Sequence, residues 1–431
     1  MHVTLKTALF LFMAVLIAAC GEAPMEKTDN VTTEKTATGK DDERLLPAGA
    51  WRGVIEIQGQ KLPFQMEVVY PSSLLTPDVV FINGEERVEV EEVHVSEDRV
   101  AMVLPAFNTR IDARYQDGKL SGTLTKINTG AVEQKMPVTM TPGEHYRFFP
   151  MLEPVDVDLS GKWSVEFKEP DGGNYPAIAE FRQVGSQVFG TFLTPMSDYR
   201  YLAGAVRDGR LYLSAWDGFH VFLFEAEIQD DGSLKGDFWS GPSYHETWTA
   251  HRDPNATLPD MDKQTWLKED AGAFDFTFPN LEGEKVSLSD PRFANKVVVV
   301  QLAGSWCPNC ADETRFLAPW YKENRDRGVE VVALMFEHFG DFEKAAKQVR
   351  IWREKYGVEY PTLIAGTSEK QNVADALPQL NTFLAFPTTI FIGRDGDVAR
   401  IHTGFNGPAT NRYEEGIAEF NATVDALLKQ E

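Results

Sequence analysis

The two neighbouring cysteines of the chain lie in Gly304-Ser305-Trp306-Cys307-Pro308-Asn309-Cys310. This stretch directly follows residues 296–302, a nearly continuous β-branched run of the kind that forms a buried central strand of a parallel sheet. Apolar residues recur with a helical period between 316 and 321. The sequence therefore predicts a strand, a cysteine pair and a helix in direct succession.

The chemistry expected of this pair is thiol-disulfide exchange. A thiolate attacks a disulfide, and a cysteine with the usual pKa of about 8.5 is mostly protonated at neutral pH. At the first turn of a helix, Cys307 would face backbone N–H groups and the positive end of the helix dipole, which lower the pKa of its thiol. Cys310, nearly one turn further along, is suited to resolving the mixed disulfide. Pro308 fits an N-terminal helical position, where its missing N–H has no cost.

A zinc site is an alternative use of a CxxC pair. It requires two further ligands at a suitable spacing, but the chain has no second cysteine pair, and its third cysteine is Cys20. The histidines are scattered along the sequence. We therefore expect no metal and no other cofactor.

Strand and helix patterns continue on both sides of the cysteines and predict an α/β domain over residues 273–431. The pattern predicts a second buried strand, an amphipathic helix, a β-hairpin and a terminal helix ending near Lys429. The segments concerned are 329–335 for the strand, 342–356 for the helix and 387–401 for the hairpin.

This domain resembles the TlpA/ResA branch of thioredoxin-like proteins, the membrane-associated thiol-disulfide oxidoreductases of bacterial envelopes. The resemblance is carried by the Phe-x-Phe-Pro-x-Leu-x-Gly motif at 276–283, by Trp306-Cys307-x-x-Cys310, by Glu313, and by Phe386-Pro387-Thr388-Thr389. It covers a little over a third of the chain and implies a thioredoxin-like fold.

The resemblance also implies roles for individual residues. Cys307 and Cys310 would be the catalytic pair, and Glu313 would handle protons near it. An acid early in a helix is also favoured by the helix dipole alone, so both interpretations of Glu313 stay open. Gln301 occupies the position of the buried aspartate of thioredoxin, so that proton acceptor is missing here.

The predicted substrate-binding residues are Trp306, Phe386 and Pro387. By the resemblance, Pro387 would follow a cis peptide bond opposite the cysteines. Such a bond would leave the backbone of Phe386 free to pair with an extended substrate. Because peroxiredoxins share the fold, a thiol peroxidase is the alternative enzyme. Peroxiredoxins place a proline and a threonine where this chain has Val300 and Gly304, which counts against that alternative.

Residues 1–19 have the pattern of a signal peptide, with Lys6 before an apolar run that is too short to span a bilayer comfortably. The ending Ile17-Ala18-Ala19-Cys20 resembles a bacterial lipobox, in which the cysteine takes a diacylglycerol. An ordinary signal peptide with an incidental cysteine is the alternative. Acylated Cys20 would anchor the protein to a lipid bilayer, with the rest of the chain in the oxidising periplasm.

The residues after Cys20 bear on sorting and on the tether. Gly21 and Glu22 include no aspartate retention signal, which slightly favours the outer membrane. Residues 20–46 contain almost nothing apolar and are expected to form a disordered tether.

The region from 47 to 252 is predicted to be all-β and duplicated, because short runs alternate apolar and polar residues between turn residues. Gly49-Ala50-Trp51 recurs as Gly161-Lys162-Trp163, and the turn at Asp117-Gly118 recurs at Asp231-Gly232 at nearly the same offset. We expect module 1 at 47–148, module 2 at 155–252 and a linker at 253–272. The modules could form two small barrels, or two halves of one larger barrel or sandwich.

The aromatic residues of these modules could line a ligand cavity or a peptide groove, but aromatics at strand spacing are more often core. This group consists of Trp51, Trp163, Tyr199, Tyr201, Trp216, Phe219, Phe222 and Trp239.

The function expected from these features is thiol-disulfide exchange with protein substrates in the cell envelope. We predict a reductase that is supplied with electrons by a membrane donor such as a transmembrane thiol reductase. The alternative is a binding or adaptor lipoprotein whose β modules recruit a ligand or partner, with the redox domain as an accessory. A formal net charge of −23 argues against nucleic acid as a partner.

Overall fold

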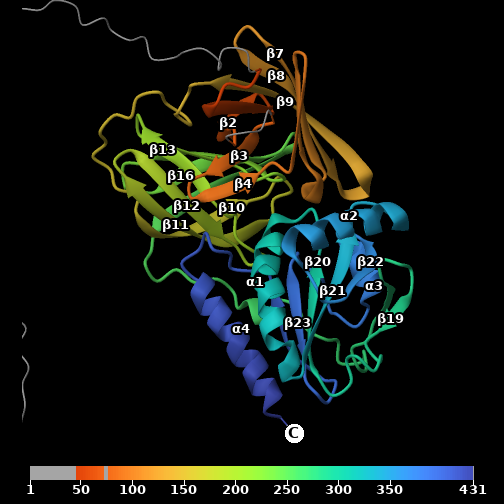
Figure 1. Cartoon of the computed structure of the whole chain (residues 1–431). Helices are drawn as coiled ribbons and strands as arrows, with labels where there is room; N and C mark the ends of the chain where they lie inside the picture. The colour runs from red at the N-terminus through yellow and green to blue at the C-terminus, as the bar shows by residue number, and fades with distance from the viewer. Residues whose placement is uncertain (1–44, 72–75, 431) are drawn as a thin grey trace, which may run out of the picture. The chain divides into compact units, whose positions relative to one another are not determined.

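The computed structural model describes residues 45–71 and 76–430 (Figure 1), and these residues belong to one compact unit. The predicted signal peptide, the predicted lipidation site at Cys20 and residues 20–44 of the expected tether lie outside the described residues. At the end of that tether, the side chain of Leu46 is fully buried in the first hydrophobic core. No helix in the described part of the chain is both long and apolar enough to cross a membrane.

The first β region is an open antiparallel sheet of nine strands in the order β4-β3-β2-β1-β9-β8-β7-β6-β5. Its two edge strands, β4 and β5, follow each other in the sequence, so the sheet would be a barrel if they paired. The strands are β1 Gly49–Ile57, β2 Gln60–Val69, β3 Asp78–Asn83, β4 Glu86–Glu89, β5 Glu92–Ser96, β6 Arg99–Leu104, β7 Thr109–Gln116, β8 Lys119–Asn128 and β9 Val132–Pro142.

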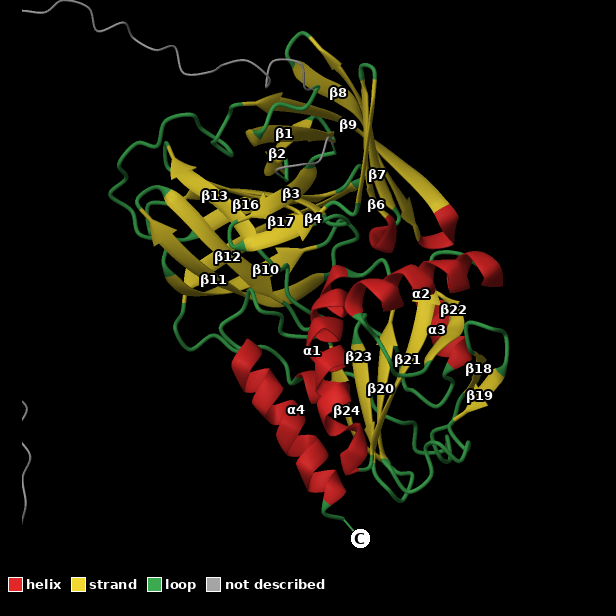
Figure 2. Cartoon of the chain, viewed as in Figure 1, coloured by secondary structure: helices red, strands yellow, loops and turns green. Residues whose placement is uncertain are grey.

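The second β region is a closed barrel in which every strand pairs with its neighbours in sequence (Figure 2). Stacked and edge-on aromatic rings fill it, as shown by Phe224 with Phe192 at 4.7 Å and with Phe238 at 4.2 Å between ring centres. Its strands are β10 Gly161–Lys168, β11 Asn174–Val184, β12 Gln187–Leu193, β13 Leu202–Arg207, β14 Arg210–Trp216, β15 Val221–Ile228, β16 Leu234–Ser240 and β17 Tyr244–Arg252.

The two regions begin in the same way, which supports a common structural unit. Trp51 of β1 donates its indole N–H to the carbonyl of Pro47 at 2.9 Å, and Trp163 of β10 donates to Leu159 at 2.9 Å. Each tryptophan lies two residues after a glycine with positive φ. In each unit the first strand pairs with both the second and the last strand. The units differ in closure, since one is a barrel and the other remains open.

The open sheet completes its hydrophobic core with residues of the barrel. Trp216, Val221 and Leu223 of β14 and β15 belong to the same buried cluster as the inner face of β1 to β9. Phe81 contacts Trp216 at 5.9 Å between ring centres, and Asn83 donates to the carbonyl of Trp216 at 2.7 Å. The β14–β15 hairpin therefore supplies apolar surface to a core that pairing of β4 with β5 would otherwise close.

The C-terminal part is an α/β domain with a five-stranded sheet in the order β22-β21-β20-β23-β24. Strands β20, β21 and β22 are parallel, whereas β23 and β24 are antiparallel to their neighbours. The elements are β20 Val297–Ala303, α1 Pro308–Asn324, β21 Val329–Glu337, α2 Phe342–Tyr356, β22 Thr362–Thr367, α3 Lys370–Ala376, β23 Thr388–Ile392, β24 Val398–Thr403 and α4 Tyr413–Leu428, preceded by the small hairpin β18 Thr277–Pro279 and β19 Lys285–Ser287.

Alternation along β20 explains how this sheet is covered. Val297 and Val299 face the cluster formed with α1, α2 and α4, whereas Val298 and Val300 face the cluster that contains Val373 of α3. Both faces of β20 are buried, as expected for a central strand. The predicted order of an all-β region followed by an α/β domain is confirmed.

Candidate active site

The cysteine pair lies where β20 ends and α1 begins. Cys307 is the N-cap of α1 and its sulfur accepts a hydrogen bond from the backbone N–H of Cys310 at 3.1 Å. The two residues form a disulfide, with their Cα atoms 5.2 Å apart. Cys307 is 5% exposed and Cys310 is fully buried. This asymmetry makes Cys307 the sulfur that an incoming reactant can meet first.

The end of β21 holds the residues that precede Cys307. The carboxylate of Glu337 accepts hydrogen bonds from the backbone N–H of Ser305 at 2.9 Å and from its hydroxyl at 2.7 Å. The indole N–H of Trp306 donates to the carbonyl of Phe336 at 3.0 Å. The ring of His338 stacks on Trp306, with 4.3 Å between ring centres. Phe336, Glu337 and His338, which are consecutive at the end of β21, therefore fix the positions of Ser305 and Trp306 before Cys307.

Glu337 is a buried acid that the sequence analysis did not identify. It is fully buried, and burial raises the pKa of its carboxyl to about 7 despite the two hydrogen bonds from Ser305. The available signal was a charged residue at the end of the apolar run 331–336, which a strand buried on both faces does not tolerate without a partner.

Glu313 lies one turn beyond Cys310 on α1 and is 3% exposed. Its carboxylate accepts from the amide of Gln301 at 2.7 Å and from the hydroxyl of Thr389 at 2.5 Å. Burial raises the pKa of this carboxyl, and the two hydrogen bonds partly oppose the shift. The sequence showed Gln301 only as the residue that replaces the proton-accepting aspartate of thioredoxin. In the structure Gln301 donates a hydrogen bond to Glu313.

The predicted substrate-binding residues lie on the other side of Cys307. The Phe386–Pro387 peptide bond is cis, which confirms that part of the expectation. The carbonyl oxygen of Phe386 lies 3.8 Å from Sγ of Cys307. The ring of Phe386 meets Trp306 edge-on at 5.7 Å between centres. The fold thus brings Trp306, Phe386 and Pro387 together around one sulfur, and their role in substrate binding stays a prediction.

Residues of the β regions also reach the motif, and the sequence analysis missed this contact entirely. Asn309, between the two cysteines, donates its amide to the carbonyl of Asp198 at 3.0 Å. Phe219 lies against Trp306 at 5.6 Å and against His338 at 5.8 Å between ring centres. No periodicity in the sequence signals contacts between segments so far apart.

A buried arginine ties the same regions to α1. Arg200 donates two hydrogen bonds to the carboxylate of Asp312, at 2.7 and 3.0 Å. It also pairs with Asp217 at 2.7 Å and with Glu86 at 2.7 Å. Burial raises the pKa of Glu86 to about 7, although Arg200 opposes the shift. One guanidinium therefore joins acids from the open sheet, the barrel and α1.

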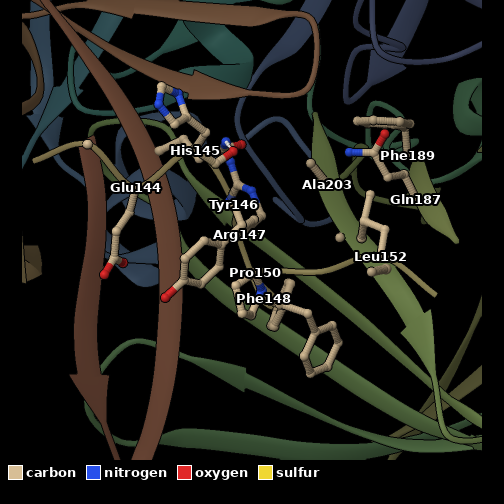
Figure 3. Close-up of a pocket in the computed structure, with 15 residues that line it drawn as sticks. Glu144, His145, Tyr146, Arg147, Phe148, Pro150, Leu152, Gln187, Phe189 and Ala203 are labelled. Atoms are coloured by element: carbon tan, nitrogen blue, oxygen red, sulfur yellow. Dashed lines mark hydrogen bonds between the residues drawn. The ribbon is translucent and has the colours of Figure 1, made fainter. Parts of the chain in front are cut away.

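A separate cleft of about 390 Å³ lies between residues 143–152 and the barrel strands β12 and β13. Figure 3 shows Glu144 to Pro150 on one side and Gln187, Phe189 and Ala203 on the other. Arg147 points inward and donates to the carbonyl of Pro63 and the hydroxyl of Ser214. None of the residues predicted for the site lines this cleft.

Comparison with known proteins gives consistent matches over the C-terminal part. Residues 270–401 match the model of the AhpC/TSA family. Thioredoxin-like protein YneN of Bacillus subtilis is 30% identical over 144 residues, which cover 33% of this chain and 75% of YneN. Thiol-disulfide oxidoreductase ResA of Bacillus subtilis is 28% identical over 138 residues, 32% of this chain and 69% of ResA.

Two further matches are similar in extent. ResA of Halalkalibacterium halodurans is 29% identical over 132 residues, and the chain spans just under two thirds of that relative, 66%. A solved structure of a thiol:disulfide interchange protein from Chlorobium tepidum aligns with 36% of this chain and 94% of its own at 19% identity, with a TM-score of 0.28.

Proposed function

Because this chain belongs to the thioredoxin-like proteins of the AhpC/TSA family through its C-terminal domain, we propose that it exchanges its Cys307–Cys310 pair with the thiols and disulfides of other proteins. The observation that carries the proposal is the position of Cys307, whose sulfur lies at the N-terminus of α1 and beside the carbonyl of Phe386. The curated relatives named ResA are thiol-disulfide oxidoreductases, which supports the same activity here.

The exchange begins with the reduced pair. The Cys307 thiolate attacks one sulfur of a substrate disulfide, which forms a mixed disulfide and releases the other substrate sulfur as a thiolate. Cys310 then attacks Cys307, so the enzyme disulfide forms and the second substrate sulfur leaves. Two electrons pass to the substrate, and its two thiolates take up protons. The N–H of Cys310, 3.1 Å from Sγ of Cys307, favours the thiolate that starts the sequence.

The direction and place of the reaction are further parts of the proposal. The protein acts as a reductase that receives electrons from a transmembrane thiol reductase, and acylated Cys20 anchors it to the envelope membrane with the folded part in the periplasm. The lipobox-like ending at Cys20 supports the anchor. A thiol peroxidase is disfavoured because the positions of the peroxiredoxin proline and threonine hold Val300 and Gly304.

Equilibration of the full chain against glutathione tests the activity and its direction together. We expect the pair to cycle as a two-electron couple with a potential near the thioredoxin value of about −270 mV, whereas a value near about −120 mV would indicate a disulfide-forming oxidant. Reduction of insulin disulfides should be lost in Cys307→Ala. In Cys310→Ala a mixed disulfide with the substrate should accumulate, visible on a non-reducing gel.

Phe189→Ala, in the cleft of Figure 3, is the matched control and should keep wild-type turnover. If Cys307→Ala reduces insulin at the wild-type rate, the proposed function is wrong.

A further inference from the structure

The loop between β14 and β15 of the barrel covers the front of the cysteine motif. Phe219 in this loop is 6% exposed and packs on Trp306 and His338, which precede and flank Cys307. Ala311, directly after Cys310, belongs to the same buried cluster as Phe219. The side of the motif that a substrate would approach is therefore occupied by a residue of the β region.

The loop has a well-defined conformation. The carboxylate of Asp217 accepts hydrogen bonds from the backbone N–H of Phe219 at 3.1 Å and of His220 at 2.7 Å. Gly218 has φ +99, and a Cβ there would lie 2.8 Å from the ring of Phe107. Only glycine fits this tip, so the position of Phe219 is set by the turn itself.

A lysine of the open sheet also contacts Phe219. Lys126 of β8 donates from Nζ to the carbonyl of Phe219 at 3.0 Å, and its ammonium lies 4.3 Å from the centre of the Phe219 ring. A cation over an aromatic face is attracted to it. Phe219 thus belongs to a loop of the barrel, is bound by Lys126 of the open sheet and packs on Trp306 of the α/β domain.

A second contact restricts the motif on the helix side. The amide of Asn309 is bound to the carbonyl of Asp198, and Asp312 is bound to Arg200 through two hydrogen bonds. With both contacts in place, Cys307 keeps only 5% of its surface exposed. Thiol-disulfide exchange requires direct access of the attacking sulfur to the substrate sulfur, and a polypeptide substrate also needs room beside the backbone of Phe386.

From these contacts we propose that Phe219 is a specificity-determining residue of the exchange reaction. While the ring of Phe219 lies on Trp306, small thiols and disulfides reach Cys307, but disulfides within proteins do not. A protein substrate reacts only after the ring of Phe219 has moved off Trp306. This inference rests on the proposed function and adds a size selection to it.

The test compares a small and a large probe of the reduced Cys307 thiol in the full chain. Iodoacetamide is the small probe, and a maleimide that carries a polyethylene glycol chain is the large one. Labelling is followed by mass spectrometry of the peptide that contains Cys307, so Cys20 does not interfere. In the wild-type protein we expect the large probe to react far more slowly than it reacts with the same chain unfolded in urea.

Phe219→Ala should raise the rate of the large probe by about tenfold or more, because the ring that packs on Trp306 is removed. The iodoacetamide rate and the potential against glutathione should stay close to the wild-type values. Lys126→Met, which removes the cation behind Phe219 and leaves the motif unchanged, should shift the large-probe rate in the same direction by a smaller factor. Phe189→Ala is the barrel control and should change neither rate.

Two results would overturn the inference. One is that the folded and the unfolded wild-type protein react equally fast with the large probe. This measurement needs no variant. The other is a Phe219→Ala or Lys126→Met protein, whichever folds, that keeps the wild-type ratio of the two rates. Failure of the proposed function shows itself differently, because the wild-type pair would then not cycle with glutathione whatever its accessibility to the probes.

Discussion

Glu313 is the residue whose meaning the sequence left open between proton transfer and a simple dipole effect. The structure weakens the dipole explanation, because an acid placed for the dipole alone gains nothing from burial, and Glu313 is 3% exposed and bound to Gln301 and Thr389. Burial raises the pKa of this carboxyl above its usual value, so Glu313 accepts a proton more readily than an exposed glutamate does.

Glu313→Gln tests the role in proton transfer. The amide oxygen can still accept from Gln301, so the fold and the potential should be kept. We expect insulin reduction to slow by about 100-fold, with a flatter pH profile, because general acid–base groups contribute about that much. A variant with the wild-type pH profile would show that Glu313 acts only on the structure of the helix.

Glu337 allows a prediction about stability, since burial raises the pKa of its carboxyl from 4.5 to about 7. A raised folded-state pKa means that the native state binds the proton more tightly than the unfolded state does. The favourable contribution is complete below about pH 4.5 and is lost as the pH rises to about 7.

Glu337→Gln should remove this pH dependence. At pH 8 the variant should be more stable than the wild-type protein by up to about 3 kcal/mol, and below pH 4.5 the difference should disappear. Urea unfolding at several pH values measures the difference. Equal stability of the two proteins at pH 8 would contradict the prediction.

Residues such as Cys307, Cys310 and Pro387 could be found from the sequence because each belongs to a short local motif. Glu337 could not, because its partner Ser305 lies on another strand end and no spacing connects the two. Gln301 was noticed only as a departure from a pattern, and its hydrogen bond to Glu313 required the packed structure.

At the scale of elements, the junction of β20, α1 and β21 explains why the motif is rigid. Gly304 lies at this junction, and a Cβ there would come within 2.3 Å of the Trp306 indole nitrogen and 2.9 Å of the carbonyl of Phe336. The glycine is needed for close approach and not for a positive φ. The indole can therefore bond to the end of β21 only because residue 304 has no side chain.

Gly304→Ala should push the Trp306 ring away from Phe336 and His338. We expect loss of about 1–3 kcal/mol of stability, as is usual for overpacking in a close-packed site, together with slower reduction of insulin. Tryptophan fluorescence and urea unfolding measure both effects. Gly172→Ala is a control for adding a side chain, since nothing lies within 4 Å of a Cβ there, although its positive φ costs some strain. Wild-type fluorescence in Gly304→Ala would contradict the expected displacement.

The elements themselves were largely predictable where each has a local pattern. The buried β20 and β21 have largely apolar runs, with four consecutive valines in β20, and the turns at Gly118 and Gly232 separate strands in the two β units. Closure was not predictable. Whether β4 pairs with β5 depends on twist and on packing against the β14–β15 hairpin, and neither leaves a trace in strand periodicity.

For the molecule as a whole, Arg200 is the residue that connects the parts. It is 3% exposed and pairs with Glu86, Asp217 and Asp312, each of which comes from a different part of the fold. Asp312 also pairs with Arg315 and Asp217 with His220, but Arg200 is the group that all three acids share.

Arg200→Met should therefore cost about 3–5 kcal/mol, because it removes the guanidinium that three buried carboxyl groups share. The unfolding curve should also lose cooperativity, with the barrel and the α/β domain unfolding separately. Arg210→Met, which removes a partly exposed pair with Glu227 on β15, is the control and should cost about 1 kcal/mol or less. A single transition with wild-type midpoint in Arg200→Met would contradict the prediction.

The open sheet has a consequence for how the chain is made. The apolar surface that completes its core comes from Trp216, Val221 and Leu223, which follow β9 in the sequence and reach it only later, whether the chain folds during synthesis or after export. Until then the apolar inner face of β1 to β9 is exposed and can associate with other apolar surfaces. A chaperone that shields unfolded chains therefore has most apolar surface to cover in the first half of the β region, and a truncation that stops before the barrel produces a polypeptide prone to aggregate.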